Sequence, residues 1–260
     1  MEGRRIAPQL SVSVSTYSRN RQASGGSDLY VAKRAPDGAE AVPRYSIWSA
    51  AVICSAFLGM ASAAAPAVHD LIGKAMAATP DAPRGQVLYS SRCSGCHGAR
   101  AWGDPTRGIP SLAGQRTLYL VVQLADFALL ERNGSEMHKA AGSADVGNPQ
   151  TIRDLAAYLS QALANPQPGR GDGRALTSGE HLFQRQCAIC HGKNADGSAD
   201  EPIPALAGQH YRYTLAQLKS FAAGHRGQVE PPVIDFTAGL SAEDQSGIAD
   251  YLSRLTVRGP

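Results

Sequence analysis

Apolar residues recur at every third or fourth position in two segments of the chain that lie far apart in the sequence. In residues 117–130 the positions with this spacing are Leu118, Val121, Val122, Leu124 and Ala125. This spacing is typical of one face of an α-helix, and residues 211–222 repeat it. The alternating pattern of a β-strand is missing. The pattern therefore predicts an all-α protein.

Signals for helix starts extend this picture. A helix is expected to run into each of two cysteine pairs, and residues 177–180, Thr-Ser-Gly-Glu, have the form of a capping box at the start of the second one. Further helices are predicted to begin at Asn148, where a proline follows in the first turn, and at Ser241, three residues before Asp244.

The cysteine pairs belong to a long internal repeat. Residues 93–97, Cys-Ser-Gly-Cys-His, recur as residues 187–191, Cys-Ala-Ile-Cys-His, at an offset of 94. The same offset relates Gly98 to Gly192, Ile109-Pro110 to Ile203-Pro204, Leu112-Ala113-Gly114-Gln115 to Leu206-Ala207-Gly208-Gln209, and Gln123-Leu124 to Gln217-Leu218. A constant offset over such a span indicates a duplicated domain. The predicted domains are residues 82–164 and 176–257, joined by a Pro- and Gly-rich linker at 165–175.

An export signal is predicted before the repeat. Residues 44–63 combine an upstream basic flank with an apolar run and end in Ala61-Ser62-Ala63, the small-x-small form of a signal-peptidase site. Cleavage is expected after Ala63, with an uncleaved membrane anchor over residues 47–68 as the alternative. Residues 1–43 are interpreted as a disordered leader or the product of a wrongly assigned start.

The formal charge of +3 lies entirely in residues 1–63, because residues 64–260 carry equal numbers of acidic and basic side chains. The repeated part of the chain thus has no electrostatic signature of nucleic-acid binding. Cys54 lies inside the apolar run and is interpreted as a small apolar residue of the signal. Four cysteines remain for chemistry, in two identical spacings.

Cys-x-x-Cys-His is the pattern for covalent attachment of a c-type haem, in which two thiols form thioethers with the porphyrin and the histidine coordinates iron. Cys93 and Cys96 would hold one haem with His97 as its proximal ligand. The equivalent residues for the second haem are Cys187, Cys190 and His191. Two alternatives are a zinc site, which needs both pairs to converge on one metal, and a redox dithiol, which needs a βαβ context. The pattern favours two covalently bound haem c groups.

Pro110 and Pro204 each follow a proximal histidine by thirteen residues. At that distance a backbone carbonyl could accept the free ring N–H and fix the tautomer. The alternative is a turn proline before the next helix, and both interpretations are compatible.

The distal ligand differs between the halves. Met137 lies between the amphipathic helix and the last helix, and we predict it as the distal ligand of the first haem, with His138 as the competitor and a core methionine as the alternative. The repeat places Pro231 at the position equivalent to Met137, and no methionine follows Cys190. An open or water-bound iron is favoured slightly over His225, with His210 and Lys219 as weaker candidates.

With these motifs in both halves, and a closing Ala-x-Tyr-Leu helix, the chain resembles the dihaem cytochrome c4 family over residues 82–257. The resemblance implies two tandem cytochrome c domains and a periplasmic electron carrier, often at or near the inner membrane. Such a carrier takes electrons from respiratory complexes and passes them toward a terminal oxidase. The family has a methionine in each half, so Pro231 departs from its pattern.

Two functions are therefore expected. The first is an electron carrier that exchanges electrons with redox partner proteins and needs no catalytic residues. The alternative is a haem enzyme or dehydrogenase subunit that uses the methionine-free second haem as a ligand- or substrate-binding site. The sequence favours the carrier.

Overall fold

A computed structural model describes residues 64–130, 132, 134–226 and 231–257. The described residues all fall within one compact unit of the chain. Their regular structure is helical, apart from one isolated β-bridge between Asp104 and Ile109. The predicted all-α class is confirmed. The predicted leader and the signal segment with its cleavage site lie outside the described residues.

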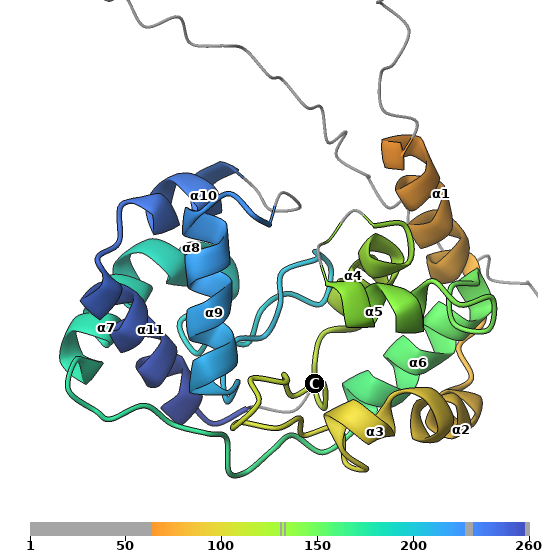
Figure 1. Cartoon of the computed structure of the whole chain (residues 1–260), viewed down its shortest axis with the longest axis horizontal. Helices are drawn as coiled ribbons and strands as arrows, with labels where there is room; N and C mark the ends of the chain where they lie inside the picture. The colour runs from red at the N-terminus through yellow and green to blue at the C-terminus, as the bar shows by residue number, and fades with distance from the viewer. Residues whose placement is uncertain (1–63, 131, 133, 227–230, 258–260) are drawn as a thin grey trace, which may run out of the picture. The chain divides into compact units, whose positions relative to one another are not determined.

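The first half of the unit contains six helices, shown in orange to green in Figure 1. They are α1 (Ala64–Ala77), α2 (Ala82–Arg92), α3 (Ser94–His97), α4 (Thr117–Ala128), α5 (Ser135–Ala141) and α6 (Pro149–Gln161). Helix α2 packs against α6, and α4 contacts both α5 and α6. Apolar side chains of α2, α4 and α6 form the core of this half, among them Tyr89, Val121 and Leu155, which are almost completely buried.

The second half repeats the arrangement without a counterpart of α1. Its elements are α7 (Leu176–Leu182), a π-helical turn η1 (Phe183–Cys187), α8 (Ala188–His191), α9 (Tyr211–Ala222), α10 (Pro231–Ala238) and α11 (Ala242–Arg254). Helix α11 packs on α7 and α9, as α6 packs on α2 and α4. Phe183 is fully buried at the position equivalent to Tyr89.

Two of the predicted helix starts are confirmed, and one is wrong. The side chain of Asn148 accepts a hydrogen bond from the Thr151 N–H, and Ser241 and Asp244 form a reciprocal capping box. Helix α7, however, has Ala175 as its N-cap and no side-chain cap, so Thr177 lies inside the first turn. The sequence pattern also gave no indication of α1, α5 and α10.

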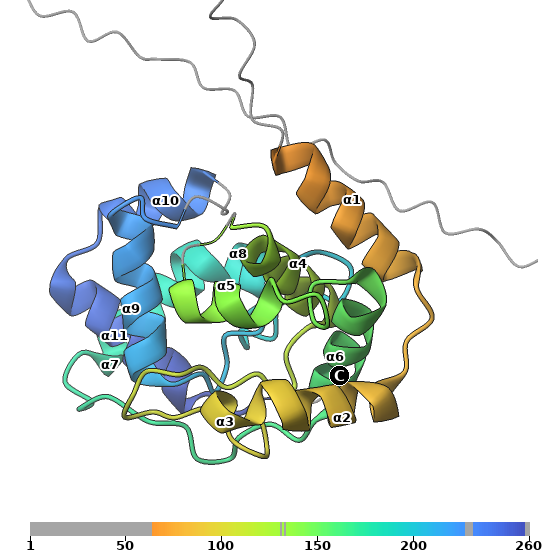
Figure 2. The same ribbon diagram turned by 45° about the vertical axis from the view of Figure 1, so that its right-hand side comes forward.

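Helix α1 packs against α4 and α6, and Figure 2 shows it beside the first half. Its Val68 and Ala75 are buried, and Ala75 belongs to the core cluster of this half. None of the helices within the described ranges is both long and apolar enough to cross a bilayer.

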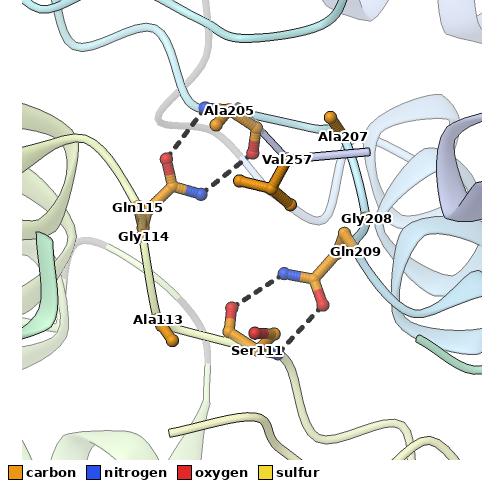
Figure 3. Close-up of a pocket in the computed structure, with 9 residues that line it drawn as sticks. All are labelled: Ser111, Ala113, Gly114, Gln115, Ala205, Ala207, Gly208, Gln209 and Val257. Atoms are coloured by element: carbon orange, nitrogen blue, oxygen red, sulfur yellow. Dashed lines mark hydrogen bonds between the residues drawn. The ribbon is translucent and has the colours of Figure 1, made fainter. Parts of the chain in front are cut away.

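Reciprocal hydrogen bonds join the two halves. The amide group of Gln115 donates to the carbonyl of Ala205 and accepts the N–H of the same residue, at 2.9 and 2.8 Å. Gln209 does the same with Ser111, at 2.9 Å for both bonds. We call this contact between the two halves the joint. Figure 3 shows Gln115 and Gln209 reaching across it in opposite directions. Because the offset of 94 relates both pairs, the interface has the self-complementary form of a twofold-symmetric contact.

A second reciprocal pair involves Arg116 and His210, which also differ by 94. Arg116 donates to the carbonyl of Asp196. The ring of His210 is fully buried, and its Nε2 lies 2.7 Å from the carbonyl of Trp102. Its Nδ1 accepts the N–H of Gly169 in the linker at 3.0 Å. Since a carbonyl can only accept, Nε2 carries the proton and the imidazole is neutral.

The third reciprocal element is a buried pair of arginines, Arg132 and Arg226, again 94 residues apart. Each guanidinium contacts polar side chains of both halves, because α4 and α9 lie beside the joint. Their hydrogen-bond partners are Gln123, Gln217, Tyr119 and Tyr213. Arg132 stacks on Phe127 and Arg226 on Phe221, with 4.5 and 4.7 Å between guanidinium carbon and ring centroid. The joint therefore fixes the segments that follow α4 and α9.

Helices α7 and α11 cross closely at Gly179, and this leads to a first prediction. A Cβ at this position would lie 2.1 Å from the backbone of Gly247 in α11. We expect Gly179→Ala to lower the free energy of unfolding by about 1–3 kcal/mol, as overpacking does. Urea unfolding of the haem-loaded protein, followed by circular dichroism, measures this change. Gly73→Ala is the control, because nothing lies within 4 Å of that site, and it should be neutral or slightly stabilising.

The neutral ring of His210 leads to a second prediction. Burial lowers the pKa of His210, against the opposing effects of the Trp102 carbonyl and of Asp104. A pKa lowered in the folded state contributes stability above the unfolded value of 6.5, and this contribution is lost as the pH falls through the folded value. Wild-type protein should therefore lose more thermal stability between about pH 7.5 and about pH 5 than His210→Gln does.

Melting curves at the two pH values measure the difference. The exposed His181 of α7 provides the control variant His181→Gln, which should behave as wild type. Equal pH dependence in wild type and His210→Gln would contradict the assignment.

Candidate functional site

Each cysteine pair lies on a short helical turn that ends in its histidine. In the first half α3 begins directly after Cys93, and the His97 N–H donates to the carbonyl of Cys93 at 3.0 Å. Gly98 then ends the turn with a positive φ of 75°. Helix α8 has the same geometry, with a φ of 76° at Gly192. This turn brings two thiols and an imidazole into one short stretch of backbone in each half.

None of these four cysteines forms a disulfide. Cys93 and Cys187 are half-buried, and Cys96 and Cys190 are exposed. Burial and the neighbouring thiol raise the pKa of Cys93 to about 11, and Cys187 behaves in the same way. A redox dithiol of the thioredoxin type depends on a lowered thiol pKa. The surroundings of Cys93 and Cys187 therefore argue against a role of these two thiols as redox nucleophiles.

His97 and His191, the predicted proximal ligands, are each oriented by the carbonyl of a proline that follows them. Nδ1 of His97 lies 3.1 Å from the carbonyl oxygen of Pro110, and the same distance separates His191 from Pro204. A carbonyl accepts, so Nδ1 carries the proton and Nε2 keeps its lone pair. Burial lowers the pKa of both histidines, which favours the neutral ring. A neutral imidazole with a fixed Nδ1–H is the form that ligates iron.

Gly103 shapes the loop that brings the Pro110 carbonyl to the ring. The Gly103 N–H donates to the carbonyl of His97 at 2.9 Å, and its φ is +73°. A Cβ at Gly103 would lie 2.3 Å from the Ile109 carbonyl. Only glycine fits this close approach, and Gly197 repeats it in the second half with a φ of +70°.

Helix α5 carries Met137 and His138, the two residues predicted as candidates for the distal ligand of the first haem. Met137 is the third residue of this helix and is half-buried. The neighbouring His138 has its Nδ1 2.9 Å from the carbonyl of Phe127 in α4. That hydrogen bond leaves Nε2 of His138 with its lone pair, so His138 and Met137 each offer an atom that can ligate iron. Met137 as the distal ligand of the first haem therefore stays a prediction.

In the second half the position equivalent to Met137 by the repeat is Pro231, the first residue of α10. His225 is exposed in the segment between α9 and α10. His210 lies at the joint with both ring nitrogens engaged. Lys219 is exposed on α9. The structure does not bring His210 to the second site.

The donor set fits two haem groups. Each half supplies two thiols in a Cys-x-x-Cys turn and one imidazole with Nε2 available, which are the groups that a c-type haem requires. In the described part of the chain no cluster of three His, Cys, Asp or Glu side chains is placed to hold a metal ion. The zinc alternative needs a converging set of that kind.

The sequence reasoning missed the polar residues of the joint. Gln115 and Gln209 were visible as part of the repeat, and Arg132 and Arg226 share the same offset, but a repeat alone does not distinguish interface residues from core residues. The feature that could have identified these interface residues is a polar side chain that occurs in both copies of the repeat beside an apolar helix face.

Comparisons with known proteins agree with this geometry. The cytochrome c family profile matches residues 82–162 and 176–256. Cytochrome c4 of Azotobacter vinelandii is 30% identical over 194 residues, which cover 68% of this chain and 90% of that protein. The thiosulfate dehydrogenase electron acceptor of Thiomonas intermedia (strain K12) is 35% identical over 175 residues, which cover 63% and 78%.

A solved structure extends the match to the arrangement of the helices. Reduced recombinant cytochrome c4 from Pseudomonas stutzeri has a TM-score of 0.60 and 31% identity, and the match covers 68% of this chain and all of that one. The doubled Cys-x-x-Cys-His turn, the two family matches and this shared fold lead to one conclusion. The chain belongs to the dihaem cytochrome c4 family of electron-transfer proteins and carries two c-type haems.

Proposed function

We propose that this chain is a periplasmic carrier that moves electrons between respiratory-chain donors and a terminal oxidase or another acceptor. The observation that carries the proposal is the pair of equivalent Cys-x-x-Cys-His sites held in one unit by a reciprocal polar joint. The glutamine pair and the arginine pair fix one half against the other. Two haem sites in a fixed relation suit transfer through one molecule.

The chain's own residues supply anchoring and orientation. Cys93, Cys96, Cys187 and Cys190 hold the two groups through thioethers, and His97 and His191 are the proximal ligands. When bound, haem supplies an iron that alternates between the ferric and ferrous states. The carbonyls of Pro110 and Pro204 keep each imidazole in a single orientation, so the ligand does not have to reorient when the charge on the metal changes.

Met137 serves as the distal ligand of the first haem in this proposal. It lies on α5, a helix that contacts α4. A thioether opposite an imidazole raises the reduction potential of the iron. The first haem would therefore be the one with the higher potential.

The export signal is part of the same proposal. Residues 44–63 would direct the chain across the inner membrane, with cleavage after Ala63. Attachment of the carrier at or near that membrane would place it beside membrane-bound donors and acceptors.

A thiosulfate dehydrogenase is a second candidate donor. The observation in its favour is the relative named thiosulfate dehydrogenase electron acceptor, which is 35% identical over 175 residues. This candidate keeps the carrier function and changes only the protein that delivers the electrons.

The distal ligand of the first haem is tested by Met137→Ala. We expect complete loss of the iron–thioether charge-transfer band of the ferric protein and a lower potential of one haem, because the sulfur ligand is removed. Absorption spectroscopy and a redox titration measure both. Met76→Ala is the matched control, since Met76 lies exposed on α1 beside Arg153, and it should leave the band intact. A band that survives Met137→Ala would contradict the assignment.

The carrier function is tested by reducing the purified ferric holoprotein with two donors in parallel. The first is a membrane preparation that contains a respiratory quinol–cytochrome c reductase, and the second is a thiosulfate dehydrogenase with thiosulfate. Stopped-flow absorption follows the reduction, and added terminal oxidase should then reoxidise the protein. Rapid reduction by only one donor identifies the partner class. Haem that neither donor reduces would refute the proposal.

A further inference from the structure

The buried arginine pair sets the register of the two distal segments. Arg132 and Arg226 make equivalent hydrogen bonds and equivalent ring contacts, so both lie at the same point of their halves. Met137 follows Arg132 by five residues, and counting five residues from Arg226 leads to Pro231. The distal position of the second half can therefore be located from a structural landmark as well as from the repeat.

The first residues of α5 and α10 give a second way to align the two distal segments. Met137 is the third residue of α5, and the third residue of α10 is Val233. Neither Pro231 nor Val233 carries an atom that ligates haem iron. Both ways of aligning the halves thus place a side chain without a donor atom where the first half has its thioether.

The other residues of α10 do not replace the missing ligand. Thr237 is buried, and its hydroxyl donates to the carbonyls of Val233 and Ile234 at 2.7 and 3.1 Å. Asp235 is exposed. Phe236 packs against the core cluster of the second half. This helix presents mainly apolar side chains, in which an anion would lose its hydration without compensation.

Of the two candidate histidines, His210 is directed away from the second site. The ring of His210 is committed to the linker and to the first half. His225 is exposed and lies directly before buried Arg226. Its backbone N–H continues the end of α9 by donating to the carbonyl of Ser220 at 2.9 Å.

We propose that no side chain of this chain serves as the distal ligand of the second haem, and that this position binds small uncharged diatomic ligands such as carbon monoxide. The inference rests on the proposed function insofar as both sites carry haem. It assigns the two halves different roles: the first is closed by Met137, and the second is open to exchange.

The test uses the full-length holoprotein, reduced with dithionite and titrated with carbon monoxide. A pyridine haemochrome assay on the same sample counts the haem. We expect two haems per chain and uptake of one carbon monoxide per two haems. Fewer than two haems per chain would refute the two-haem carrier itself. A full haem count without carbon monoxide uptake would overturn only the open second site. Uptake by every haem would overturn the closure of the first site by Met137.

Two variants identify the site. Met137→Ala should raise the uptake to one carbon monoxide per haem, and uptake that stays at half would show that the ligand binds at the first haem instead. His225→Ala should leave both the uptake and the rate of rebinding after flash photolysis unchanged. If His225 occupied the position, its removal would speed rebinding about tenfold or more, because a competing ligand lowers the fraction of competent sites. That acceleration would overturn the proposal.

Discussion

The hydrogen bond between a proximal histidine and the carbonyl thirteen residues later is the interaction on which each half depends. It joins the Cys-x-x-Cys-His turn to the loop that leads into the long helix, α4 or α9. The loop reaches the ring only because Gly103 and Gly197 allow the backbone to approach closely. One backbone contact thus fixes the imidazole and the path of the chain toward the joint.

The joint between the halves continues from the same loops. Gln115 and Gln209 follow Pro110 and Pro204 by five residues and bind backbone groups of the opposite half. The positions of the imidazoles and of the interface are therefore set by the same segments of chain. A displacement of one loop would disturb the histidine ring and a contact between the halves together.

The sequence was informative wherever a feature depends on local chemistry. The periodicity at residues 117–130 and 211–222 predicted α4 and α9, and Asn148 and Ser241 start their helices as capping residues do. The capping box at Thr177 failed because Ala175 already begins α7, through a carbonyl that accepts the N–H of Gly179. A backbone hydrogen bond of that kind leaves no trace in the residue types.

Features set by long-range contacts were not predictable in the same way. Helix α1 is held by packing on α4 and α6 rather than by a strong helix signal of its own. At the joint, Gln, Arg and His side chains bind main-chain atoms that are far away in the sequence. Because every residue has such main-chain atoms, the residue types of the partners do not reveal these contacts. The repeat gave the positions of the ligands, whereas their surroundings had to come from the structure.

The glutamine contacts have a consequence for how the halves can change. Gln115 and Gln209 bind the main-chain N–H and carbonyl of their partners, and one partner is a serine while the other is an alanine. Hydrogen bonds to backbone atoms do not depend on which side chain the partner residue carries. Substitutions at these partner positions leave the attachment intact, which lets two copies of one ancestral domain diverge in chemistry while they remain joined in the same way.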